Sequence, residues 1–404
     1  MRILIYSHDT FGMGNIRRML AISRGLLEGL PGASILLLTG SPVIHTLFPT
    51  GRPNDRRRMD YVKLPCLTRT DRGVYQARYL DLSVEELSSL RAELILAAVR
   101  NFSPDLLIVD KKPLGVRGEL EPALRYLQTE RPATRRMLIL RDILDRPEAI
   151  ITNWKGHGHD VSLQRDYDRI LILGQQELFD PVVEYQFSEE AASRTRFCGY
   201  LQRGVEAEGA EPSRQLWESL GLDPSSVKRT LLVTPGGGED GSRVVETSLL
   251  ALARRPQPEL QTIVVGGPEM PGDQRDHLRR LADSIPNTIF LDFSRNLPGL
   301  MAAADLIVSM GGYNTICEIV SLRRKAIVIP RVRPTEEQLI RMERLAPLDL
   351  FAVLHPDELT VELMADAIER QLAAKPAEAD WQRIDLGAQQ VINMEVERML
   401  GHGQ

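Results

Sequence analysis

The sequence predicts an α/β protein with two domains, each built on an open parallel sheet. Short apolar runs alternate with stretches of helical periodicity along almost the whole chain, which is typical of βα units. The chain has 404 residues, which is too long for one ordinary hydrophobic core and fits two domains of about 200 residues each.

Six apolar runs in the first half are expected to be strands: residues 3–7, 34–39, 61–64, 106–110, 137–142 and 170–174. Between the first two, apolar residues recur at helical spacing from Ile16 to Leu30, and Pro31 with Gly32 should end that helix. The second half repeats this rhythm without internal sequence similarity, at residues 230–234, 262–266, 288–293, 306–310, 326–330 and 351–354.

A polar segment rich in Gly, Glu and Pro, residues 202–212, is expected to link the domains. The predicted divisions are an N-terminal domain at 1–200, a linker at 201–212, a C-terminal domain at 213–379 and a helix at 380–404. That last helix could return to the first domain. Two facing α/β domains predict a cleft between them, and ligands of such sheets collect beyond the carboxyl ends of the strands.

Composition narrows the function classes. A net charge of -5 argues against a general nucleic-acid binder, which needs a basic excess. The three cysteines, Cys66, Cys198 and Cys317, form no paired metal motif and fit a reducing compartment. No run approaches the roughly 20 apolar residues of a membrane span. We therefore expect a cytoplasmic protein, and the composition leaves peripheral membrane contact open.

A glycine-rich turn follows the expected strand 306–310. Gly311 and Gly312 would let a ligand approach the backbone, and the N–H groups at the start of the next helix favour anions. Asn314 or Thr315 could cap that helix and touch a phosphate. Glu318, one helical turn later, is well placed for ribose hydroxyls. The alternative is a packing turn with Glu318 merely exposed to solvent.

A second glycine-rich turn, TPGGGEDG, follows the expected strand 230–234 and precedes a helix that should start near Ser242. This turn contains more glycines than its conformation requires, at Gly236, Gly237 and Gly238. The excess suggests that the backbone here forms a second side of a diphosphate site. A flexible loop is the alternative.

A third turn, between the first strand and the first helix, could bind an acceptor or a phosphate through Gly12, Gly14, Asn15 and Arg17. As a dinucleotide motif it is weak, because Arg17 replaces the third glycine. Arg17 and Arg18 oppose the helix dipole at a cost of about 0.3–1 kcal/mol each, which favours an anion-binding role. Solvated arginines explain the pattern equally well.

Residues 309–315 with Glu318, residues 326–330 and the pair Glu337–Gln338 resemble the GT-B glycosyltransferases. The likeness is to family 28, which includes the peptidoglycan N-acetylglucosaminyltransferases, and to related predicted bacterial glycosyltransferases. It extends over most of the chain but rests on few motifs in the N-terminal half. The resemblance implies two Rossmann-like domains and a nucleotide-sugar donor, with the nucleoside diphosphate expected to be uridine diphosphate.

By the same resemblance, the Gly311–Gly312 turn holds the donor diphosphate and Glu318 binds the ribose. Glu337 and Gln338 would lie near the donor sugar. Residues 236–238 match the second glycine loop of the family, and residues 264–268 and 291–293 match the strands that flank its base pocket. The family often has a histidine where this chain has Asn15, and an amide cannot act as a general base.

The resemblance implies transfer to an acceptor hydroxyl with inversion. Since no Asp-x-Asp metal motif is present, we expect a metal-independent site without a cofactor. Arg331 could stabilise the leaving diphosphate, or it could form a surface ion pair. His8 and Asp9 are the first candidates for the catalytic base. Each could instead be structural, as could two further candidates, Asp110 and Asp142.

Other basic residues are weaker signals. His157 and His159 suggest a metal site, but without further ligands at useful spacing a mobile loop is favoured. The Lys111–Lys112 pair and the arginines at 56–58 fit solvated loops, or else contacts to an anionic acceptor or a membrane surface.

Three alternatives to a transferase remain open. A nucleotide-sugar 2-epimerase of the same fold would convert the donor without an acceptor. A dinucleotide-dependent oxidoreductase using the Gly12–Gly14 turn would bind a nicotinamide cofactor. A non-catalytic nucleotide-sugar sensor would bind the donor without turnover.

Overall fold

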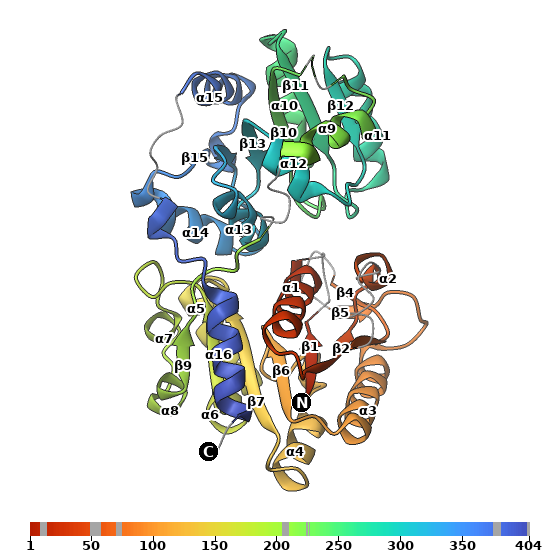
Figure 1. The fold of residues 1–404 in the computed structure, drawn as a ribbon, viewed down its shortest axis with the longest axis vertical. Coiled ribbons are helices and arrows are strands. Elements are labelled where there is room, and N and C mark those ends of the chain that lie inside the picture. Colours follow the sequence, from red (N-terminus) through yellow and green to blue (C-terminus); the bar gives the residue numbers. More distant parts are fainter. Residues whose placement is uncertain are drawn as a thin grey trace. The chain divides into compact units, whose positions relative to one another are not determined.

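The computed structural model describes residues 1–8, 14–48, 58–69, 75–203, 210–223, 225, 227–374 and 381–401. The chain divides into two compact units (Figure 1). Unit 1 comprises Met1–Gly199 with Gly387–Gln404, and unit 2 comprises Tyr200–Leu386.

Unit 1 contains a seven-stranded sheet in the order β3-β2-β1-β6-β7-β8-β9, and all its pairings are parallel. The strand order reverses between β1 and β6, so their carboxyl ends form the switch point where ligands of such sheets bind. The strands are β1 Arg2–Ser7, β2 Ser34–Thr39, β3 Met59–Lys63, β6 Leu106–Asp110, β7 Arg135–Arg141, β8 Arg169–Leu173 and β9 Thr195–Phe197. The six strands expected here are confirmed to within two residues at each end.

The helices of unit 1 follow the apolar periodicity of the sequence. α1 buries Ile16, Met19 and Leu20 on one face and ends before Pro31, as expected. α3 starts with a capping box in which Ser83 and Glu86 bond each other's backbone N–H groups. The bounds are α1 Gly14–Gly29, α2 Ile44–Leu47, α3 Val84–Phe102, α4 Glu121–Thr129, α5 Pro147–His157, α6 His159–Arg165, α7 Pro181–Glu184, α8 Glu189–Ser193 and α16 Ala388–Leu400, with a hairpin of β4 Leu67–Arg69 and β5 Tyr75–Ala77.

The C-terminal helix α16 packs against α1 within unit 1 (Figure 1). Gly25 and Gly29 leave room on α1 for two polar side chains of α16. A Cβ on Gly25 would lie 2.1 Å from Cδ of Gln389, and Asn393 Nδ2 donates to the Gly25 carbonyl at 3.1 Å. The expectation that this helix starts at residue 380 is wrong, because Trp381–Arg383 forms a 3-10 turn and α16 begins at Ala388.

Unit 2 contains a six-stranded parallel sheet in the order β12-β11-β10-β13-β14-β15, with its switch point between β10 and β13. α9 begins at Ala210, inside the expected linker. The strands are β10 Arg229–Thr234, β11 Leu260–Val265, β12 Thr288–Leu291, β13 Leu306–Ser309, β14 Ala326–Val328 and β15 Ala352–Val353. The helices are α9 Ala210–Ser219, α10 Ser242–Arg254, α11 Gly272–Asp283, α12 Leu297–Ala303, α13 Tyr313–Ser321, α14 Glu337–Leu345 and α15 Val361–Ala373.

Candidate functional site

Two glycine-rich turns meet at the switch point of unit 2. β10 and β13 are neighbours, and Thr234 pairs with Ser309 at their carboxyl ends. The turn that contains Gly236 and the turn that contains Gly312 therefore leave the same edge of the sheet. A Cβ on Gly236 would lie 3.8 Å from Oγ1 of Thr315, so the two turns are close neighbours. The structure thus brings together the two loops that the sequence predicted to act as one site.

The three glycines of the first turn have different roles. Gly236 and Gly238 have φ angles of 83° and 96°, which favour glycine. A Cβ on Gly238 would lie 2.4 Å from the carbonyl oxygen of Gly266, so Gly238 is needed for backbone packing against the end of β11. A Cβ on Gly237 would meet open space, with no atom beyond its chain neighbours within 4 Å. Gly237 is therefore the member of this turn that a ligand could approach.

The start of α13 carries no side-chain cap. Gly312 occupies the N-cap position and has no side chain that could accept a hydrogen bond from the first turn. The expectation that Asn314 or Thr315 caps this helix is therefore wrong. The N–H groups at the first turn of a helix favour an anion.

Glu318 and Asn314 share one arginine. The Nη2 atom of Arg203 lies 3.6 Å from Oε1 of Glu318, and its Nη1 atom donates to Oδ1 of Asn314 at 2.9 Å. The backbone N–H of Arg203 also donates to Ser321 Oγ at 2.9 Å. Glu318 is only 1% exposed, so the alternative of a solvent-exposed carboxylate is wrong. Sequence reasoning missed Arg203, because one arginine in a polar segment gives no signal apart from a linker.

Arg331 joins the first turn to the start of α14. Its guanidinium lies 3.2 Å from Asp240 and 3.5 Å from Glu337, and its backbone N–H donates to Gln338 Oε1 at 3.0 Å. Glu337 and Gln338 are buried. The charge of Arg331 is thus balanced by two carboxylates, which agrees with the ion-pair alternative.

A second arginine that the sequence did not reveal fixes the Gly311–Gly312 turn. Arg341 is buried, donates from Nη1 to the carbonyl of Gly311 at 3.1 Å, and lies 5.6 Å from the centre of the Tyr313 ring. No sequence motif pointed to Arg341, which lies on α14.

His8 lies at the carboxyl end of β1 in unit 1, and a chain of polar contacts holds its backbone. Asn15 Nδ2 donates to the His8 carbonyl at 2.5 Å, and Asn15 Oδ1 accepts from Arg18 at 3.0 Å. Arg18 also pairs with Asp110 at 2.6 Å, and both side chains are buried. Arg18 is therefore not solvated, and Asp110 pairs with it instead of with the lysines that follow.

The His8 side chain is 1% exposed, and its Nδ1 atom has no hydrogen-bond partner within the described parts of the chain. Burial holds the pKa of His8 well below its ordinary value, and the charges of Lys111, Lys112, Arg91 and Arg18 lower it further. His8 is therefore neutral at pH 7.

The remaining candidates of unit 1 are placed as follows. Asp142 is buried and accepts a hydrogen bond from the N–H of Ile143 at 2.7 Å. Gly14 is the first residue of α1, and Arg17 is half-buried in its first turn. Asp9 and Gly12 lie outside the described residues.

Four further findings concern a basic residue, the thiols, metal ligands and membrane spans. Arg58 is not simply solvated, since it donates to the carbonyls of Leu27, Leu30 and Pro31 at the end of α1. The three cysteines are free and buried, as expected. Among the residues that the structure describes, no group of three or more His, Cys, Asp or Glu side chains could hold a metal ion. Over the same residues, no helix is both long and apolar enough to cross a bilayer.

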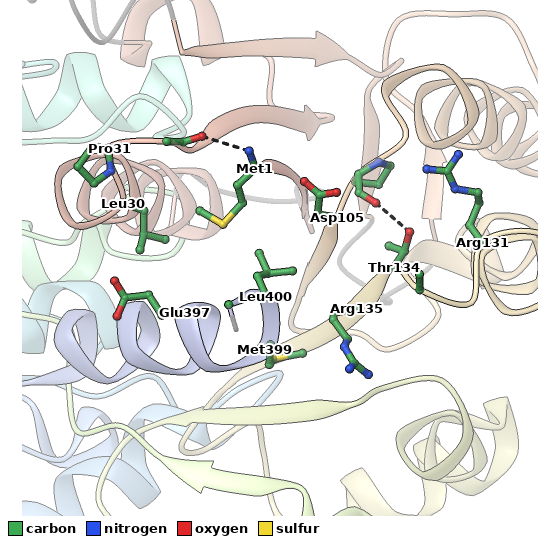
Figure 2. Close-up of a pocket in the computed structure, with 14 residues that line it drawn as sticks. Met1, Leu30, Pro31, Asp105, Arg131, Thr134, Arg135, Glu397, Met399 and Leu400 are labelled. Carbon is green, nitrogen blue, oxygen red and sulfur yellow. Dashed lines mark hydrogen bonds between the residues drawn. The ribbon is translucent and has the colours of Figure 1, made fainter. Parts of the chain in front are cut away.

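A cavity of about 670 Å³ lies at the opposite, amino edge of the unit 1 sheet (Figure 2). Its lining includes Met1, Asp105, Thr134 and Leu400, and Thr134 is already bonded to the Pro104 carbonyl at 2.8 Å. None of the predicted site residues lines it. The candidate functional residues therefore lie away from this cavity, at the carboxyl edges of the sheets.

Known proteins share both the fold and part of the sequence. Residues 230–386 match the model of the glycosyltransferase family 28 C-terminal domain. The UDP-N-acetylglucosamine--N-acetylmuramyl-(pentapeptide) pyrophosphoryl-undecaprenol N-acetylglucosamine transferase of Bacteroides fragilis is 32% identical over 131 residues. That match covers 31% of this chain and 33% of the relative, so the chain spans about a third of the length of that protein.

Two solved structures extend the likeness to the whole fold. The glycotransferase of kitacinnamycin has a TM-score of 0.64 at 15% identity and covers 99% of both chains. The UDP-GlcNAc 2-epimerase of Neisseria meningitidis also has a TM-score of 0.64, at 11% identity, over 98% of this chain and 100% of its own. The chain thus has the GT-B fold and is similar to glycosyltransferase family 28, with the similarity to that family's C-terminal domain at residues 230–386.

Proposed function

We propose that this protein is a cytoplasmic glycosyltransferase that moves a sugar from a UDP-sugar to an acceptor hydroxyl, with inversion and without a metal ion. One observation carries the donor part of the proposal. The cluster of Arg203, Asn314 and the buried Glu318 lies beside two glycine turns at the switch point of unit 2. A carboxylate, a cation and the N–H groups of a helix start are the groups that bind ribose and diphosphate.

Each donor part has a partner in this arrangement. The Glu318 carboxylate accepts hydrogen bonds from the two ribose hydroxyls. The diphosphate lies over the first turn of α13 and against the open side of Gly237. Arg203, which lies between Glu318 and Asn314, turns toward the diphosphate and balances the charge that the leaving group gains.

The transfer step needs a base for the acceptor hydroxyl. Neutral His8 takes the proton while the hydroxyl oxygen forms the new bond to the anomeric carbon. The bond from that carbon to the diphosphate oxygen breaks, and nucleoside diphosphate leaves with its electron pair. Asn15 cannot replace His8 as the base, because its amide is committed to the His8 carbonyl and to Arg18.

The donor site is tested by titrating the protein with uridine diphosphate, followed by calorimetry and thermal unfolding. We expect saturable stabilisation that Glu318→Ala removes. The matched control is Glu259→Ala, which removes an exposed carboxylate of the same unit that pairs with Lys228. If no nucleoside diphosphate stabilises the protein, or if both variants bind like the wild type, the donor assignment is wrong.

A 2-epimerase is the second candidate, because an epimerase shares the fold at the same TM-score as the glycotransferase. The two reactions differ in their need for an acceptor. Incubation with UDP-N-acetylglucosamine alone, followed by sugar analysis, separates them: an epimerised sugar supports the epimerase. Turnover that requires an added acceptor supports the transferase.

A further inference from the structure

Lys112, which follows β6 in unit 1, carries a charge that no carboxylate balances within the described residues. Its Nζ atom donates to the hydroxyl of Tyr75 at 3.2 Å and lies 5.5 Å from the centre of that ring. The side chain is half-buried. A phenol hydroxyl and a ring face leave the positive charge of an ammonium group uncompensated, so the position favours an anion.

Two imidazoles accompany this charge. The rings of His157 and His159 stack with centres 5.9 Å apart and an interplanar angle of 18°. His159 is 5% exposed, and its Nδ1 atom has no hydrogen-bond partner in the part of the chain that the structure describes. A buried polar group without a partner destabilises the fold and calls for an explanation.

The positive charge of Lys112 acts on the His159 imidazole. Burial lowers the pKa of His159 to about 4, with further lowering by Lys112 and His157, while Asp160 acts in the opposite direction. His159 is thus a neutral imidazole near a cation at pH 7. A metal ion would be repelled by Lys112, whereas an anion would be attracted by Lys112 and could accept an imidazole N–H bond.

The backbone around Lys112 is fixed in an unusual conformation. Lys111 and Arg117 both have positive φ angles, 68° and 50°. Left-handed positions of this kind are strained for residues other than glycine and persist only where the surroundings hold them. Two buried tyrosines do so here: Tyr167 donates its hydroxyl to the Pro113 carbonyl, and Tyr6 accepts from the N–H of Val116 at 3.3 Å. The ammonium group therefore extends from a rigid support.

We propose that Lys112, His157 and His159 form an oxyanion-binding site in unit 1 that takes a phosphoryl or carboxyl group. Lys112 supplies the charge, and His159 donates a hydrogen bond from its unpartnered Nδ1 atom, whereas the Nδ1–H of His157 is donated to the Asn153 carbonyl at 2.8 Å. The assignment of that group to the acceptor rests on the proposed function, because unit 1 would hold the acceptor. The site itself stands independently of the reaction.

The test is an NMR titration of the protein with histidine labelled at the imidazole ring. Inorganic phosphate, pyrophosphate and malonate are added in turn at constant ionic strength, with sodium chloride as the reference. We expect saturable shifts of the His157 and His159 signals, assigned from the His157→Gln and His159→Gln variants. A response to phosphate or pyrophosphate alone identifies a phosphoryl group, and a response to malonate alone identifies a carboxyl group.

Charge variants complete the test. Lys112→Gln should weaken the binding at least tenfold, and Lys112→Arg should retain it. Lys228→Gln removes one positive charge from unit 2 and should leave the titration unchanged. The proposal is overturned if no oxyanion gives a saturable shift, or if Lys112→Gln, folded by its melting curve, binds as the wild type does. Stabilisation by uridine diphosphate, measured on the same sample, reports separately on the donor site.

Discussion

Arg203 and Glu318 form an ion pair inside unit 2, with Nη2 and Oε1 3.6 Å apart and both side chains at least nine-tenths buried. A buried charge that loses its partner is destabilising, because desolvation is no longer offset by the attraction. The two residues belong to segments that the sequence places in a linker and in a helix. Their pairing joins the start of unit 2 to helix α13.

Arg203→Met should therefore lower the free energy of unfolding by about 3–5 kcal/mol, measured in urea. The double variant Arg203→Met with Glu318→Gln should recover part of this loss, since no charge is left buried alone. Lys228→Met is the control, because its pair with Glu259 is exposed and should contribute little to stability. Equal losses in the single and double variants would show that packing, and not charge, controls the effect.

Gly237 and Gly238 separate ligand contact from backbone packing. Gly238→Ala introduces a Cβ 2.4 Å from the Gly266 carbonyl at a φ of 96°, so thermal unfolding should occur at a clearly lower temperature. Gly237→Ala meets open space and should leave the melting temperature within a few degrees of the wild type. Its affinity for uridine diphosphate should nevertheless fall. Unchanged affinity would mean that the diphosphate does not approach this turn.

The sequence predicted the sheets well because parallel strands buried on both faces are continuous apolar runs. It missed β4, β5 and β9, which have three residues each and are too short to show a pattern. The glycine turns were found by composition, and the strand order then brought them to one edge.

Partners of buried charges were the part that the sequence could not predict. Arg18 was expected either to bind an anion or to be solvated, yet it pairs with Asp110, 92 positions away. Arg203 and Arg341 were missed for the same reason. An ion pair between distant segments depends on the fold and leaves no periodic trace in either segment.

A substitution at the contact between α1 and α16 should have two opposing effects on stability. Gly25→Ala raises helix propensity by about 1 kcal/mol, but its Cβ would lie 2.1 Å from Gln389 Cδ. We expect the single variant to be less stable than the double variant Gly25→Ala with Gln389→Ala, in which the methyl group has room. Chemical unfolding of both proteins measures the difference. If the single variant is the more stable one, Gln389 moves aside without loss.

His8 should make the stability of the protein depend on pH. Its pKa in the folded state lies well below the ordinary value, mainly because of burial, so the unfolded chain takes up a proton that the folded chain does not. The contribution to stability is therefore complete above about pH 6.5 and is lost as the pH falls. Below pH 6.5 the slope should be about 1.4 kcal/mol per pH unit for this one proton.

The measurement is the free energy of unfolding from pH 7.5 to pH 5 for the wild type and for His8→Asn. We expect the free energy of unfolding of the variant to fall less steeply with decreasing pH, by the contribution of one proton. His159 also has a lowered pKa, but it contributes equally in both proteins. Transferase activity should be lost in the variant across the whole range, because the base is absent at every pH. Parallel stability curves would show that the pKa of His8 is the same in the folded and unfolded protein, which would contradict a buried neutral imidazole.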